Sequence, residues 1–182
     1  MNITVYLGAT SVDNDELNNA AVELGEWIAK NNYTLVYGGS KMGLMGKLAI
    51  SAIGGGAHVI GVEPQMFMDH ELQLDILPEL IVTEDMAERK TKMIELGDAF
   101  IAFPGGTGTL EEITEVMSQR SLRLSDAPCI LYNLGGYYDH LKAHLEKMIE
   151  MGLSSSKRQE GIYFADTLEE IEKIIKETLY CI

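Results

Sequence analysis

The chain has 182 residues, of which 46% are hydrophobic and 23% are charged, and its formal net charge is −14. This length fits one domain, and no apolar run reaches the roughly 18–20 residues of a membrane span. The negative charge argues against binding to nucleic acid or anionic membranes, so an anionic ligand would need a local device such as a glycine nest or a helix N-terminus.

Strand and helix signals alternate along the whole chain. In chain order, the pattern predicts a strand at 3–8, a helix at 13–31, a strand at 33–39, a helix at 43–56, strands at 57–64 and 78–84, a helix at 86–97, a strand at 98–104, a helix at 109–123, a strand at 128–133, a helix at 137–151, a strand at 161–166 and a helix at 166–179. The strands are apolar on both sides, which is typical of a covered parallel sheet. We therefore predict one Rossmann-like α/β domain over residues 1–182, doubly wound, with a mainly parallel sheet of about seven strands and helices on both faces.

Two helix starts carry cap signals. Asp13 with Glu16, and Asp166 with Glu169, have the spacing of an N-cap and its N3 partner. The stretch 64–78 is the one long irregular segment, and long loops of this kind are often functional.

Cysteine and histidine usage argues against a metal centre. Cys129 and Cys181 form no CxxC pair and the four histidines are scattered. We expect no zinc site, no metal and no disulfide framework, and a reducing cytoplasm as the setting. The first residues, MNITVYLGATS, lack the basic and apolar regions of a signal peptide.

Glycines gather in the stretch PGGTGTLEE, residues 104–112, at the end of a predicted strand. Glycine N–H groups and the next helix's N-terminus could hold an anion. The alternative is a plain turn in which Thr109 caps the helix and Glu112 closes a capping box. Neither the dinucleotide fingerprint nor the P-loop is complete, so we expect no NAD and no Walker-type ATP site. The glycines of GGSKMGLMG, residues 38–46, have the same two interpretations, since helix–sheet packing also needs small residues.

Charged residues flank the glycine stretch. Glu111, Glu112 and Glu115 follow it and either form a solvated face that suits the helix dipole or belong to a site. Arg89, Lys90 and Lys92 are clustered before it, either as a solvated helix face or as a phosphate-binding group.

Taken together, residues 38–46, 88–93 and 104–112 resemble the LOG family, the cytokinin riboside 5′-monophosphate phosphoribohydrolases, which are often mislabelled lysine decarboxylases. Its two signatures, E-R-K-x-x-M and P-G-G-x-G-T-x-x-E, are complete here as ERKTKM and PGGTGTLEE. The order of expected strands and helices is similar over nearly the whole chain. Two departures concern base specificity: LGATS follows the first strand, and SQRSLRLS stands where the family usually has a tryptophan.

The resemblance implies a hydrolase that cuts the N-glycosidic bond of AMP or an N6-modified AMP, as in cytokinin activation, and releases a free base and ribose 5-phosphate. By this resemblance, Arg89 and Glu112 match the catalytic pair. The positions that match substrate contacts are Gly39, Ser40, Glu71, Lys90, Gly105, Gly106, Thr107, Gly108, Thr109, Glu111 and Ser118. The resemblance also implies a homodimer, with helices around 86–123 near the interface, and no cofactor.

Two other function classes stay open at this point. A nucleotide or molybdenum-cofactor carrier would bind without cleavage and is similar in fold and glycine loop. A lysine decarboxylase would need a pyridoxal lysine, and nothing in the sequence marks one.

Overall fold

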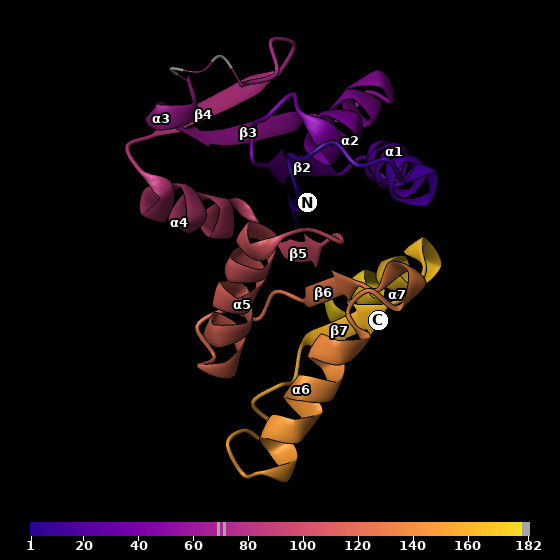
Figure 1. Cartoon of the computed structure of the whole chain (residues 1–182), viewed down its shortest axis with the longest axis vertical. Coiled ribbons are helices and arrows are strands. Elements are labelled where there is room, and N and C mark those ends of the chain that lie inside the picture. The colour runs from indigo at the N-terminus through magenta and orange to yellow at the C-terminus, as the bar shows by residue number, and fades with distance from the viewer. Residues whose placement is uncertain (69, 71, 180–182) are drawn as a thin grey trace. The chain divides into compact units, whose positions relative to one another are not determined.

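The computed structural model describes residues 1–68, 70 and 72–179, and it divides into two compact units, Met1–Asp98 and Ala99–Ile182. Each unit alternates strands and helices (Figure 1). Together they contain the seven predicted strands among the described residues, and the α/β fold class is confirmed.

The first unit contains four strands that pair in parallel in the order β4-β3-β2-β1. Its elements are β1 (Asn2–Tyr6), α1 (Asp15–Lys30), β2 (Thr34–Tyr37), α2 (Gly43–Gly54), β3 (Val59–Pro64), α3 (Gln65–Met68), β4 (Glu79–Thr83) and α4 (Met86–Leu96). Helices α1 and α2 pack on each other and on β2, while α4 packs along all four strands. Right-handed crossovers place α1 and α2 on one face of these strands, which leaves the other face to α4.

The second unit contains three strands that pair in parallel in the order β5-β6-β7. Its elements are β5 (Ala99–Ala102), α5 (Thr107–Ser121), β6 (Cys129–Tyr132), the 3-10 turn η1 (Leu134–Gly136), α6 (Asp139–Glu150), β7 (Ile162–Ala165) and α7 (Leu168–Leu179). Every residue of β5 and β6 is buried, as the continuous apolar runs predicted.

Both predicted cap assignments are wrong by one residue. At α1 the cap is Asn14, whose side-chain oxygen accepts a hydrogen bond from Leu17 N at 3.1 Å. At α7 the Thr167 hydroxyl accepts from Glu170 N at 3.2 Å, and the Glu170 carboxylate accepts from Asp166 N at 2.7 Å. A capping box is therefore present at the start of α7, but it is formed by Thr167 and Glu170, one residue after the predicted pair.

The irregular segment 64–78 contains the short helix α3. Gln73 in this segment forms an isolated antiparallel bridge with Ser40. Two of its residues, 69 and 71, lie outside the described part of the chain. In the part that is described, no helix is both long and apolar enough to cross a membrane.

Candidate functional site

In the unit Met1–Asp98, the loop that leaves β2 is fastened to the segment after α3. Leu74 N donates a hydrogen bond to Gly39 O at 3.0 Å, and Lys41 N donates to Leu72 O at 2.8 Å. The Ser40 hydroxyl accepts from Met42 N at 3.1 Å. Gly39 and Ser40 are both buried, so this loop has a fixed shape at the carboxyl ends of its strands.

The glycines of this loop are explained by neighbouring protein atoms. A Cβ at Gly38 would lie 2.3 Å from Arg89 Nη2, and one at Gly46 would lie 2.1 Å from the Lys41 carbonyl oxygen. Gly39 and Gly43 have positive φ values of 84° and 53°, which favour glycine. Of the two interpretations of GGSKMGLMG, the structure supports packing. The predicted substrate contacts at Gly39 and Ser40 stay predictions.

Arg89 is the member of the predicted basic cluster that is buried. Its side chain comes from α4, which begins after Asp85, whose carboxylate accepts from Glu88 N at 2.8 Å. Arg89 is 4% exposed, and its Nε donates to Val62 O at 2.9 Å. A guanidinium group keeps its charge in a protein, so α4 brings a fixed positive charge to the end of β3. For this residue, the interpretation as a solvated face is wrong.

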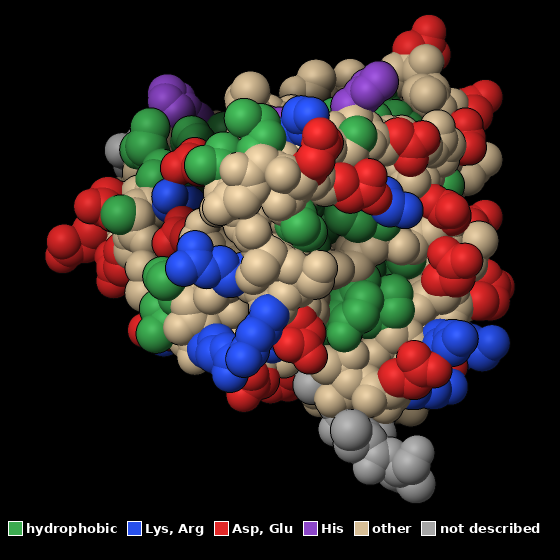
Figure 2. All heavy atoms as spheres, turned by 90° about the horizontal axis from the view of Figure 1, so that it is seen from below, with side chains coloured by type: hydrophobic (Ala, Val, Ile, Leu, Met, Phe, Trp, Pro, Cys, Tyr) green, Lys and Arg blue, Asp and Glu red, His purple; other side chains and the backbone are tan. Residues whose placement is uncertain are grey.

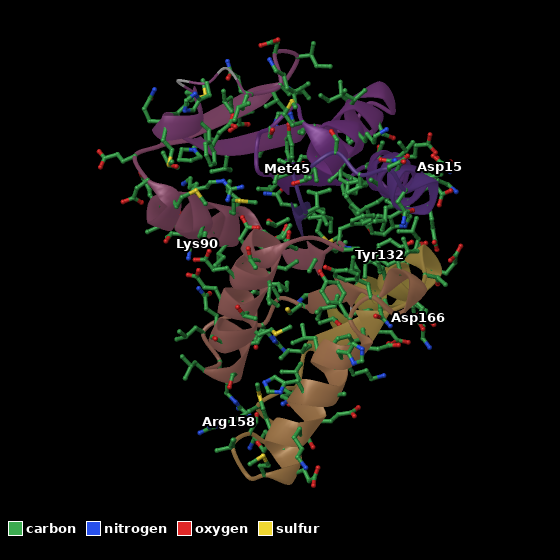
Figure 3. The ribbon with its side chains drawn as sticks, in the orientation of Figure 1. Asp15, Met45, Lys90, Tyr132, Arg158 and Asp166 are labelled. Atoms are coloured by element: carbon green, nitrogen blue, oxygen red, sulfur yellow. The ribbon has the colours of Figure 1, made fainter. Side chains whose placement is uncertain are left out.

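The other two members of the cluster lie nearer the surface. Lys92 pairs with Glu95 at 3.3 Å, and Lys90 is half-buried on α4, where Figure 3 labels it. Figure 2 shows acidic side chains over much of the face that it presents, with basic side chains in small groups. The buried charge of Arg89 is thus a local feature in an acidic molecule.

Glu63 is a buried carboxyl group at the end of β3 that was not among the residues predicted from the sequence. The residue is 1% exposed, and its Oε2 has no hydrogen-bond partner among the described residues. Burial raises the pKa of Glu63, and the charge of Arg89 only partly opposes this. Burial and the nearby Glu63 also raise the pKa of the Tyr37 hydroxyl. The only sequence signal was an acidic residue inside an apolar strand, VIGVEP.

In the unit Ala99–Ile182, the glycine stretch runs directly from β5 into α5. The helix begins at Thr107, with Gly106 as its N-cap residue. Its first backbone hydrogen bond runs from Leu110 N to Gly106 O at 3.1 Å. The N–H groups of Thr107, Gly108 and Thr109 therefore precede the first helical hydrogen bond. The alternative interpretation, a capping box of Thr109 and Glu112, is wrong, because the helix already begins at Thr107 with Gly106 as its N-cap residue.

The three glycines of this stretch differ in what surrounds them. A Cβ at Gly105 would lie 2.3 Å from the Thr109 hydroxyl oxygen, so packing requires glycine there. A Cβ at Gly106 or Gly108 would meet no described atom within 4 Å, and neither residue has a positive φ. Open space beside the N–H groups of a helix's first turn is what an anion site requires.

A cavity of about 390 Å³ opens beside the glycine stretch, which is within the size range of small-molecule sites. Its lining residues are Gly105, Gly106, Thr107, Leu110, Tyr137, Tyr138 and Leu141. The Tyr137 hydroxyl donates to Gly105 O, and the Tyr138 hydroxyl donates to Phe103 O at 2.8 Å. These tyrosines, which sequence analysis missed, fix the backbone on both sides of Pro104.

The remaining predicted residues of α5 have different environments. Glu112 is buried, with 7% exposure, whereas Glu111 is exposed. Ser118 is exposed, donates to Thr114 O at 2.8 Å and lines a separate hollow of about 410 Å³. Glu71 lies outside the described residues. Across the described part of the chain, no group of three or more His, Cys, Asp or Glu side chains could hold a metal ion.

The sequence family described as "Possible lysine decarboxylase" matches residues 45–175 of this chain. The chain is 39% identical to cytokinin riboside 5′-monophosphate phosphoribohydrolase LOG3 of Arabidopsis thaliana, over 98% of this chain and 83% of that protein. It is also 39% identical to the probable cytokinin riboside 5′-monophosphate phosphoribohydrolase LOGL6 of Oryza sativa subsp. japonica, over 93% of this chain and 68% of that protein.

Solved structures share the fold at lower identity. The molybdenum cofactor binding protein of Rippkaea orientalis superposes with a TM-score of 0.74 at 23% identity, over 97% of this chain and 95% of the other. The Moco carrier protein of Chlamydomonas reinhardtii has a TM-score of 0.72 at 21% identity, over 100% of this chain and 98% of the other. At such identities the likeness concerns the fold alone. The family match and the near full-length relatives together show that this chain belongs to the LOG family.

Proposed function

We propose that this protein hydrolyses the N-glycosidic bond of a nucleoside 5′-monophosphate, AMP or an N6-modified AMP of the cytokinin type. The observation that carries the proposal is the 39% identity over 98% of the chain to a cytokinin riboside 5′-monophosphate phosphoribohydrolase. The products are a free base and ribose 5-phosphate, and the reaction uses no cofactor.

The phosphate group binds at the start of α5. Support comes from the open space at Gly106 and Gly108 and from the three N–H groups that precede the first helical hydrogen bond. The positive end of the helix dipole adds to the attraction for an anion. Thr107 offers a hydroxyl group at the edge of the neighbouring cavity. These features give an acidic protein the local anion device that its net charge demands.

Bond cleavage generates positive charge on the ribose. As the C1′–N bond breaks, its electron pair goes to the base, and the ring becomes oxocarbenium-like. We assign Glu112 to stabilise this cation and to orient the attacking water. The water oxygen forms the new bond to C1′, and the proton that the water loses balances the proton that the departing base takes up. Gly106 is the N-cap residue of α5, so the role proposed for Glu112 is not a capping role. Arg89 supplies a buried, permanent positive charge that binds phosphate or orients a carboxylate.

The assay for this function is incubation with AMP and with N6-modified AMP, followed by chromatography for the free base. The proposal predicts base release in proportion to time and enzyme. A protein that binds these nucleotides in calorimetry without releasing base would instead be a carrier. The carrier alternative has only the shared fold in its favour.

Glu112→Gln tests the assignment of the carboxylate. The amide keeps the shape but cannot carry negative charge, so we expect kcat to fall at least about 100-fold while nucleotide binding is largely kept. The matched control is Glu150→Gln, an exposed glutamate of the same unit that pairs with Lys147. If Glu112→Gln turned over at the wild-type rate, Glu112 would have no part in the mechanism.

We also propose a homodimer in the cytoplasm. A set of exposed apolar side chains in the unit Ala99–Ile182 supports the homodimer. The buried free thiol of Cys129 supports the cytoplasmic setting. The remaining LOG-type contacts, at Gly39, Ser40, Glu71, Lys90, Glu111 and Ser118, are part of the same proposal. So is the organisation of residues 1–182 as one domain.

A further inference from the structure

The guanidinium group of Arg89 lies directly against the backbone of Gly38. A Cβ added to Gly38 would lie 2.3 Å from Arg89 Nη2, a distance that real Cβ atoms do not show. The guanidinium has little freedom to move away, because Arg89 is 4% exposed and its Nε donates to Val62 O at 2.9 Å. The end of β2 and the end of β3 thus hold one side chain from α4.

No other feature of Gly38 calls for glycine so strongly. Its φ is not in the positive range, so an alanine fits the backbone conformation. The next two nearest atoms belong to Met45, whose Cε would lie 2.9 Å and whose Sδ would lie 3.1 Å from the added Cβ. Met45 lies near the start of α2 (Figure 3), and a methionine end adapts readily. Arg89 is the neighbour that an added methyl group would displace.

We propose that Gly38 is a positioning residue for Arg89: its bare Cα leaves the slot that fixes the guanidinium group. This inference rests on the proposed function for its catalytic consequence, though not for its structural one. It assigns the first glycine of GGSKMGLMG to the orientation of a side chain and not to direct contact with phosphate. Gly38 therefore acts on the reaction through Arg89 alone.

A double-mutant cycle measures this dependence. Gly38→Ala should lower kcat/KM for AMP at least about tenfold, because a displacement of the order of 1 Å impairs a reacting group. Arg89→Lys removes the branched head that the methyl group meets. In that background Gly38→Ala should change kcat/KM by less than about twofold, since coupled residues are not additive. The control is Gly54→Ala, an exposed position at the end of α2 where a Cβ meets no described atom within 4 Å.

Thermal melting gives a second cycle that needs no activity. Gly38→Ala should lower Tm in the wild-type background and leave it unchanged beside Arg89→Met, which removes the guanidinium. Equal losses in both backgrounds, in kinetics or in melting, would overturn the inference. If the wild type released no base from any nucleotide, the proposed function would fail, and the melting cycle would still decide the role of Gly38.

Discussion

At the residue scale, Glu63 has an environment that opposes its ionised form. It is 1% exposed, and the guanidinium of Arg89 offsets only part of the effect of burial, so its pKa in the folded protein is raised. In the unfolded chain the group has its ordinary value of 4.5. The folded state therefore holds the proton more tightly. This contribution to stability is complete below the ordinary value and is lost as pH rises through the folded pKa.

We predict that Glu63→Gln becomes more stable relative to wild type as pH rises. The amide is neutral at every pH, so the variant does not lose the contribution that wild type loses. Urea unfolding of both proteins at about pH 5.5 and about pH 8 measures the difference in free energy of unfolding. A difference that does not change between the two pH values would show that Glu63 titrates as in the unfolded chain.

Individual residues were predictable from the sequence where a motif carries them and not where contacts do. Arg89 and Glu112 were proposed because ERKTKM and PGGTGTLEE are continuous stretches, and their catalytic roles stay predictions. The slot at Gly38 escaped prediction because it joins α4, β2 and β3, whose contacts depend on the strand register. Glu63 escaped because the buried strand VIGVEP follows the apolar pattern everywhere except at that residue.

At the element scale, packing at the start of α5 requires glycine at position 105 but not at positions 106 and 108. We predict that Gly105→Ala lowers the free energy of unfolding by about 1–3 kcal/mol, because its methyl group meets the buried Thr109 side chain. Gly108→Ala should leave stability unchanged or raise it by up to about 1 kcal/mol, since alanine favours the helix.

Gly108→Ala should weaken nucleotide binding even though it does not lower stability. A methyl group there enters the space that we assign to the nucleotide phosphate, so Gly108→Ala should weaken AMP binding at least about tenfold. Calorimetry with AMP and urea unfolding of the same preparations check both halves. A Gly108→Ala protein with wild-type affinity would show that the open space is not used by the ligand.

The starts of α1, α5 and α7 show that a local sequence pattern predicts the presence of a helix better than it predicts the helix's first residue. The spacing T-x-x-E suggested a cap at Thr109, but the chain already turns into the helix at Gly106. At α1 and α7 the competing candidates were adjacent polar residues, and the structure uses Asn14 and Thr167. The presence of a helix followed from periodicity, while its first residue depended on which of several caps the preceding strand allowed.

At the scale of the whole molecule, the second unit exposes several large apolar side chains. Leu122 is 69% exposed, and Leu124, Met151 and Leu153 are 72%, 63% and 70% exposed. Leu122 is the C-cap residue of α5 and lies in the region around 86–123 that we expect near a dimer interface. A contact between two copies would remove such side chains from water.

We predict a dimer for wild type in sedimentation analysis and a monomer for Leu122→Glu. A charge placed in an apolar contact has no partner there and weakens association strongly. Ile50→Glu, which is on α2 in the other unit and 51% exposed in wild type, is the control and should stay dimeric. An unchanged mass for Leu122→Glu would place the interface elsewhere, and a monomeric wild type would exclude the dimer.

The fold class was predictable because apolar strands and periodic helices alternate through the whole sequence, and each observed strand lies within a predicted one or one residue outside it. The candidate site was proposed only as separate motifs, and it stays a prediction. Which glycines serve packing and which leave open space depends on distances between elements, and a sequence pattern does not contain them.

We propose that the protein cleaves AMP-type nucleotides at the glycosidic bond. The most direct test is a product balance: AMP incubated with wild-type protein, with free adenine and ribose 5-phosphate measured by chromatography over time. We expect equal amounts of the two products, rising together as AMP falls. No free base from AMP or from N6-modified AMP, at any enzyme concentration, would contradict it.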